Sequence, residues 1–100
     1  MGRHMNFKTI TGTRGSGVST QLVLESSLSR APILCMYYPS KRHLLDRAAE
    51  LGVTIPEPLT IGEFNDRGLI KPKRIIIDDA SFVLENLLGS QIHAIGATIE

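Results

Sequence analysis

A glycine-rich segment, residues 12–20, constrains the fold of this 100-residue chain more than any other feature. It follows a β-prone run, Phe7–Thr11, and precedes a run of helix-compatible composition, Thr20–Leu28. Glycines allow a tight turn in which successive N–H groups point inward around an anion, and a following helix adds the positive end of its dipole. A strand, such a turn and a helix in this order favour an α/β fold with an anion site at the turn.

The spacing within this segment matches the phosphate-binding pattern G-x-x-x-x-G-K-[ST], apart from one position. Gly12, Gly17 and Ser19 match, and Val18 stands where the pattern has lysine. Valine offers neither a charge nor a hydrogen bond to the β- and γ-phosphates. Arg14 lends charge to the phosphates in one interpretation and faces solvent in the other. The residues expected to bind the nucleotide are Gly12, Thr13, Arg14, Gly15, Ser16, Gly17, Val18, Ser19 and Thr20.

Strand-like and helix-like patterns alternate along the rest of the chain. The expected elements are a strand at Ile33–Tyr38, a helix capped by Ser40 and ended by Gly52, a short helix from Thr60 to Asp66, a strand at Ile75–Ile77, a helix at Phe82–Leu88 and a strand at Ile92–Ile99. Right-handed crossovers would place the four strands in a mostly parallel sheet, in the order second, third, first, fourth. The expected fold class is therefore α/β, with three layers around a sheet of about four strands.

An acidic pair, Asp78 and Asp79, directly follows the strand expected at Ile75–Ile77. Ligands of parallel sheets bind beyond the carboxyl ends of the strands, where this pair, the glycine segment and Thr98 all lie. Mg²⁺ takes oxygen ligands, so Asp78 and the Ser19 hydroxyl are its expected ligands beside phosphate oxygens. Asp79 is the expected catalytic residue, which orients the attacking water. In the alternative interpretation, the two aspartates cap the helix that begins near Ser81.

Taken together, these segments resemble P-loop NTPases of the additional-strand type over residues 7–99. They are most similar to the first motor domain of superfamily-1 helicases, and the glycine loop is also similar to that of phage terminase ATPases. The matching segments are Gly12–Ser19 for the first motif, Ile33–Lys41 for the strand and loop that touch single-stranded DNA, Thr60–Phe64 for a T-[IL]-x-x-F element, Asp78–Ser81 for D-E-A-S and Gly96–Thr98 for the end of the sensor strand. The resemblance implies that Thr98 is a sensor residue.

The resemblance implies binding of a purine nucleotide, ATP, with Mg²⁺, and the departures from it imply hydrolysis that is weak or absent. Val18 replaces lysine, Asp79 replaces glutamate, and the sequence holds no second motor domain to supply an arginine finger. A second hypothesis is a catalytically inert P-loop scaffold that acts as a protein-interaction module, of a kind suited to a phage or mobile-element protein linked to replication or packaging. A third is that Val18 was engineered or selected in a protein whose natural form has lysine.

Nucleic acid is a further candidate partner, since basic residues gather at Lys41–His43 with Arg47 and at Lys71–Arg74, and Tyr37 and Tyr38 lie near the first group. Stacking aromatics beside positive charge are typical of single-strand binding. A net charge of +1 gives this interpretation no support, so solvated helix faces are favoured. Met36 and Tyr37 are expected in the core.

No apolar run reaches the roughly 18 residues of a membrane span, so no membrane partner is expected. The single cysteine, Cys35, lies in an apolar run and indicates a buried thiol in a reducing compartment. We therefore expect a cytoplasmic protein, in the host cytoplasm if it is phage-encoded. Residues 1–5 resemble a cloning scar, and residues 6–100 are expected to form one minimal P-loop NTPase-like domain.

Overall fold

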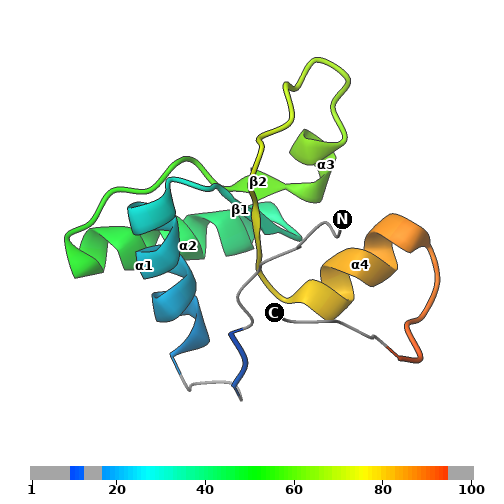
Figure 1. Cartoon of the computed structure of the whole chain (residues 1–100), viewed down its shortest axis with the longest axis horizontal. Helices are drawn as coiled ribbons and strands as arrows, with labels where there is room; N and C mark the ends of the chain where they lie inside the picture. Colours follow the sequence, from blue (N-terminus) through cyan, green and yellow to red (C-terminus); the bar gives the residue numbers. More distant parts are fainter. Residues whose placement is uncertain (1–9, 13–16, 95–100) are drawn as a thin grey trace, which may run out of the picture.

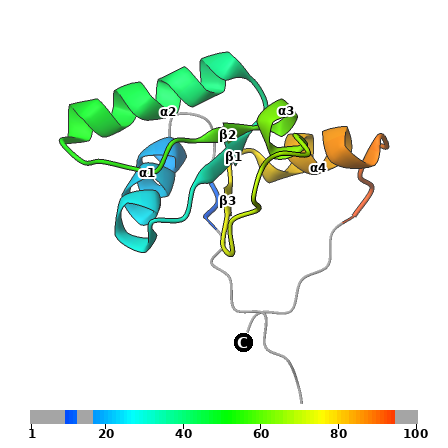
Figure 2. The same cartoon turned by 90° about the horizontal axis from the view of Figure 1, so that it is seen from above.

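The structure, a computed structural model, describes residues 10–12 and 17–94. This part of the chain forms helices and short strands in alternation. Figure 1 shows α1 and α2 on one side of the strands and α4 on the other, and Figure 2 shows the same separation from above. The elements are α1 (Val18–Ser29), β1 (Ile33–Cys35), α2 (Tyr38–Leu51), β2 (Leu59–Thr60), α3 (Ile61–Phe64), β3 (Ile76–Ile77) and α4 (Ala80–Leu88).

The strands form a parallel sheet in the order β2-β1-β3. Leu34 in the central strand pairs with Leu59 on one side and with Ile77 on the other. Parallel strands need crossover connections, and α2 and α3 lie in the two that this sheet requires. The second and third predicted strands, at Ile33–Tyr38 and Ile75–Ile77, were expected to be neighbours in the sheet. The parallel pairing of β1 with β3 confirms this expectation. β2 was not predicted, because two residues are too short to show an alternating pattern.

β1 is buried on both faces, which explains its continuous apolar sequence. Successive side chains of a strand point to opposite faces. Accordingly, Ile33 and Cys35 belong to one core cluster, with residues of α1 and α2, whereas Leu34 belongs to a second cluster with Ile61 of α3 and Val83 of α4. Helices therefore cover both faces of the central strand, and the coarse α/β class expected from the sequence is confirmed. The first cluster comprises Leu22, Val23, Ile33, Cys35, Leu44 and Ala48.

The first and fourth strands, expected at residues 7–11 and 92–99, are not found among the described residues. Residues 7–9 and 95–99 lie outside the described residues. The described ends of these segments, residues 10–11 and 92–94, have no strand conformation. The described sheet therefore has three strands in place of about four, and the predicted strand order is observed only for its second and third members.

The boundaries of the helices differ from the prediction at their N-termini. β1 ends at Cys35 and α2 begins at Tyr38, so the expectation of a strand through Tyr38 and a cap at Ser40 is wrong. Pro39 lies in the first turn of α2, where a missing N–H removes no helical hydrogen bond. Tyr37 is the N-cap residue and is 62% exposed, so its expected place in the core is also wrong. α1 and α4 each begin two residues earlier than expected.

The short helix α3 begins with the predicted capping box. Thr60 Oγ1 accepts a hydrogen bond from the Glu63 N–H at 3.1 Å, and Glu63 Oε1 accepts one from the Thr60 N–H at 2.9 Å. Lys41 Nζ of α2 donates to both Glu63 carboxylate oxygens at 3.1 Å and to Glu57 Oε2 at 3.2 Å. Lys41 is only 6% exposed. It therefore belongs to neither a basic surface patch nor a solvated helix face, but links α2 to α3 through a buried ammonium group paired with a partly exposed carboxylate.

Candidate functional site

A pocket of about 1150 Å³ opens beyond the carboxyl ends of β1 and β3. Its walls come from the start of α1, the β1–α2 connection, one face of α2 and the β3–α4 connection. The structure thus brings the glycine segment and the acidic pair to one place. The sequence-predicted site residues that line the pocket are Gly12, Gly17, Val18, Ser19, Thr20, Asp78 and Asp79. The other predicted site residues, Thr13, Arg14, Gly15, Ser16 and Thr98, lie outside the described residues.

The start of α1 contributes Gly17, Val18 and Ser19 to the pocket. Gly17 is the N-cap residue and has a φ of 90°, in the left-handed region that favours glycine. No atom lies within 4 Å of the place where a Cβ on Gly17 would stand, so its backbone conformation is what requires glycine there. Val18 is partly buried and packs against the first core cluster. At the lysine position of the pattern, this chain has an apolar anchor for the helix.

Asp78 lies at the junction of β3 and the pocket. Its N–H donates to the Leu34 carbonyl at 2.9 Å, which continues the pairing of β3 with β1. Burial raises the pKa of the half-buried Asp78 carboxyl, the charge of Asp79 raises it further, and His43 on α2 acts in the opposite direction. The charge of the Asp78 carboxyl is therefore influenced by two other side chains of the pocket wall, Asp79 and His43.

Asp79 is the N-cap residue of α4, with a φ of 57°. Its exposed side chain makes no capping hydrogen bond. Asp79 is thus at the N-cap position, as the capping interpretation expects. Its carboxylate does not cap the helix, however, and Asp79 lines the pocket. Aspartate tolerates the left-handed region better than most residues with a side chain.

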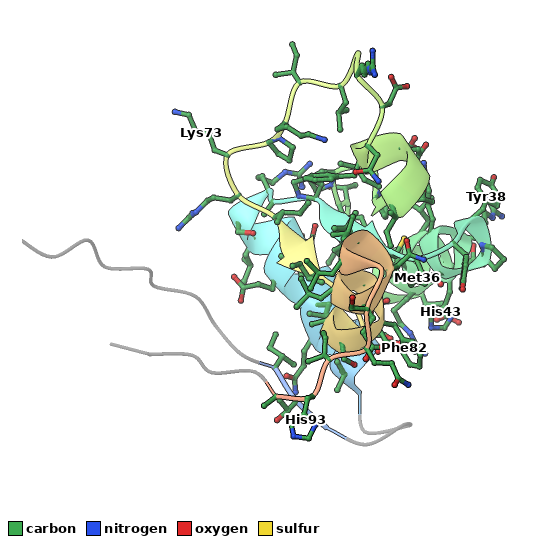
Figure 3. All side chains as sticks on the ribbon, turned by 90° about the vertical axis from the view of Figure 1, so that its right-hand side faces the viewer. Met36, Tyr38, His43, Lys73, Phe82 and His93 are labelled. Atoms are coloured by element: carbon green, nitrogen blue, oxygen red, sulfur yellow. The ribbon has the colours of Figure 1, made fainter. Side chains whose placement is uncertain are left out.

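The face of α2 that lines the pocket was not predicted. Ser40, His43 and Arg47 lie on this face, at the spacing that brings side chains to one side of a helix. Figure 3 labels His43 of α2, Met36 of the β1–α2 connection and Phe82 of α4, which line the same pocket. Helical spacing predicts that residues 40, 43 and 47 lie together. Nothing in the sequence indicates that they face the ends of the strands.

Arg47, on this wall, has a buried polar atom, Nε, without a hydrogen-bond partner among the described residues, 10–12 and 17–94. Its Nη1 lies 3.6 Å from Glu50 Oε1, which is longer than a good hydrogen bond. The neighbouring Arg42 does not line the pocket, and its Nη2 lies 3.8 Å from Asp46 Oδ1, an equally loose ion pair.

Within the described part of the chain, no group of three or more His, Cys, Asp or Glu side chains could hold a metal ion by itself. None of the helices described there is long and apolar enough to cross a membrane. Comparisons with protein-family models, with curated proteins and with solved structures found no match. The function of the pocket is therefore inferred from its own residues.

Proposed function

We propose that this protein is a P-loop domain that binds a purine nucleotide, ATP, together with Mg²⁺, and that hydrolysis is slow or absent. One observation carries the proposal: a single pocket is lined both by the start of α1 and by the carboxyl of Asp78. A helix N-terminus favours phosphate, and a carboxylate favours a hard cation. A magnesium–nucleotide complex presents both of these partners at once.

The residues present fit such a ligand. The volume of about 1150 Å³ is slightly above the usual range for small-molecule pockets, so a nucleotide has room. Ser19 and Asp78 supply two oxygen ligands for Mg²⁺, and a bound phosphate supplies more, so a cluster of three protein ligands is not needed. The exposed Asp79 is the candidate for orienting a water molecule. In this proposal, the helices against both faces of β1 form the three layers of a P-loop fold.

Slow turnover follows from the side chains that replace the usual ones. Val18 packs against the core and cannot neutralise charge on a transferring phosphoryl group. Asp79 is one methylene shorter than glutamate and projects from a left-handed residue. At about 3 kcal/mol for each electrostatic contact, two such losses raise the barrier by roughly 5–6 kcal/mol. Binding through backbone N–H groups is independent of both side chains.

The second candidate function is that of an inert P-loop scaffold that binds another protein. Exposed apolar side chains on α4 favour it, since Phe82 is 59% exposed and Leu88 is 68% exposed. These exposed side chains offer apolar contact area to a partner protein. The two candidates differ in whether nucleotide binds at all.

Calorimetric titration with a non-hydrolysable ATP analogue and Mg²⁺ tests the proposal. We expect a Kd between tens of micromolar and millimolar, equivalent to about 4–6 kcal/mol. Val18→Lys should tighten binding by about 1–3 kcal/mol, the scale of a charge-assisted hydrogen bond. Gln21→Lys is the matched control, because it adds the same charge at an exposed position of α1 that does not line the pocket.

A phosphate-release assay completes the test. Hydrolysis should stay near background in the Val18 form and rise only modestly in Val18→Lys, because Asp79 remains. Brisk hydrolysis by the Val18 form would contradict the proposal. Absence of binding by both forms would favour the interaction scaffold.

A further inference from the structure

The described pocket wall carries two basic side chains, His43 and Arg47, and both come from α2. Neither belongs to the glycine segment, so the phosphate-binding pattern does not account for them. The start of α1 and Asp78 lie on other walls of the same pocket. A positive charge on α2 therefore faces the space in which an anion would lie between the helix N-terminus and the acidic pair.

We propose that Arg47 binds the terminal phosphates of a nucleoside triphosphate in the bound state before any transfer, and so supplies affinity that the lysine of the pattern would otherwise give. This inference rests on the proposed function and identifies a ligand-binding residue of the same site. The guanidinium group carries a permanent charge and a planar set of donors that matches two phosphate oxygens at once.

Two observations show that Arg47 is weakly partnered: Nε has no hydrogen-bond partner among the described residues, and Nη1 has one long contact, with Glu50. Buried polar groups in folded proteins nearly always have a hydrogen-bond partner, yet Arg47 Nε has none among the described residues. The contact with Glu50, at 3.6 Å, joins Arg47 to a carboxylate that is 67% exposed. Exposed pairs of this kind are weak, so a phosphate can compete with Glu50 for the guanidinium.

The position of Arg47 on α2 also suits this task. His43, one turn earlier on the same face, is close enough to Asp78 for its charge to influence that carboxyl. The α2 face and the acidic pair thus line the same pocket. Arg47 extends the same face by a further turn, and the α2 helix, which packs on α1 and β1 through Leu44 and Ala48, holds it in place.

Titration of ATP analogue, ADP and AMP, each with Mg²⁺, against the whole chain and its Arg47→Gln variant tests the inference. Loss of one charge-assisted contact should weaken binding of the triphosphate about 10- to 100-fold, with little effect on AMP. Arg47→Lys should restore part of the triphosphate affinity. Arg42→Gln is the matched control, since Arg42 lies on the same helix and does not line the pocket. It should bind every nucleotide as the unchanged chain does.

A second variant decides the matter if Arg47→Gln does not fold. Glu50→Gln removes the competing carboxylate at an exposed position and should tighten triphosphate binding about 2-fold, the scale of an exposed ion pair. If Arg47→Gln binds the triphosphate as tightly as the unchanged chain, the inference is overturned and the proposed function stands. The same conclusion follows if Glu50→Gln binds the triphosphate with unchanged affinity. Absence of binding of any nucleotide by the unchanged chain would overturn both.

Discussion

Asp78 occupies a site where burial opposes its charge. Its backbone N–H completes the pairing of β3 with β1, which fixes the residue at the edge of the pocket. Burial and the neighbouring charge of Asp79 raise its carboxyl pKa, and His43 offsets only part of that rise. A carboxylate in such a position weakens the fold at neutral pH. Residues of this kind mark sites that bind cations or take part in catalysis.

Asp78→Asn should therefore stabilise the protein at pH 7. The carboxyl of the folded protein has a raised pKa, so its destabilising effect is complete above that value and absent below the pKa of about 3.9 in the unfolded chain. We expect a gain within about 1 kcal/mol, because solvent screens a half-exposed group. Urea unfolding at pH 7 and at pH 3 measures it, and the gain should vanish at pH 3. A less stable Asp78→Asn at pH 7 would contradict this account.

Single residues of the site were predictable where a backbone rule applies to them. Gly17 at a helix start and Asp78 after a buried strand follow from local pattern, and the parallel topology then brings them to one edge of the sheet. The places of Arg47 and His43 were not predicted. The apolar residues Leu44 and Ala48 set the rotation of α2 and can be recognised in the sequence, but which elements border the flank with Arg47 and His43 depends on tertiary packing.

At the scale of elements, the junction of α2 with α3 depends on Glu63. This side chain closes the capping box of α3 and also accepts hydrogen bonds from the buried Lys41. The Thr60 N–H lowers the pKa of Glu63 most, and the hydrogen bond from Lys41 adds to the effect. Burial lowers the pKa of Lys41, but its hydrogen bonds with Glu63 and Glu57 outweigh that and raise it overall.

Glu63→Gln should destabilise the protein by about 1 kcal/mol between roughly pH 5 and pH 10. The value is well below that for breaking a fully buried pair, because Glu63 is 47% exposed and Glu57 still contacts Lys41. The depressed pKa of Glu63 gives stability that is present above its unfolded pKa and lost as pH falls through the folded value. Lys41, with a raised pKa, loses its contribution only at alkaline pH.

Urea unfolding across this range compares Glu63→Gln with Glu57→Gln as the control, since Glu57 lies outside the capping box and is 72% exposed. The control should cost less. A loss of stability in Glu63→Gln that persisted unchanged at pH 2 would show that charge is not the cause.

The elements themselves were predicted unevenly. The capping box joins residues three apart, so sequence alone could identify it. Lys41 and Glu63 are 22 residues apart, and their pairing exists only in the folded chain. Pro39 is compatible with both the end of a strand and the first turn of a helix. Tertiary packing decided between the two, and the prediction placed the boundary too late.

At the scale of the whole molecule, helices on both faces of β1 make one thiol a sensitive probe of folding. Cys35 is fully buried, and burial, with a smaller effect of Asp78, raises its pKa to about 11. At pH 8 the folded protein therefore holds little of the reactive thiolate. Alternation of strand and helix predicted this α/β class, whereas the number of strands was not predictable from runs of only two residues.

Alkylation of Cys35 by iodoacetamide at pH 8 should be at least about 100-fold slower in the native protein than in 6 M urea, since a stable domain opens rarely. Mass spectrometry over time measures the rate. The thiol should be protected still further by any nucleotide that binds the folded state alone. Similar rates under native and denaturing conditions would contradict the burial of β1.

The pairing of β1 also has a consequence for the rate at which the chain folds. Ile33 pairs with Ile76, and Leu34 pairs with Leu59, so the sheet joins segments far apart in sequence. Forming such contacts requires large loops to close, and the entropy lost in closing them precedes the stabilisation by the contacts. Folding is therefore slower than in helical proteins of equal length. The contacts between α1 and α2 are more local and can form earlier. The pairing of β3 with β1 joins the segments that lie farthest apart in this sheet, and the same pairing creates the acidic side of the pocket.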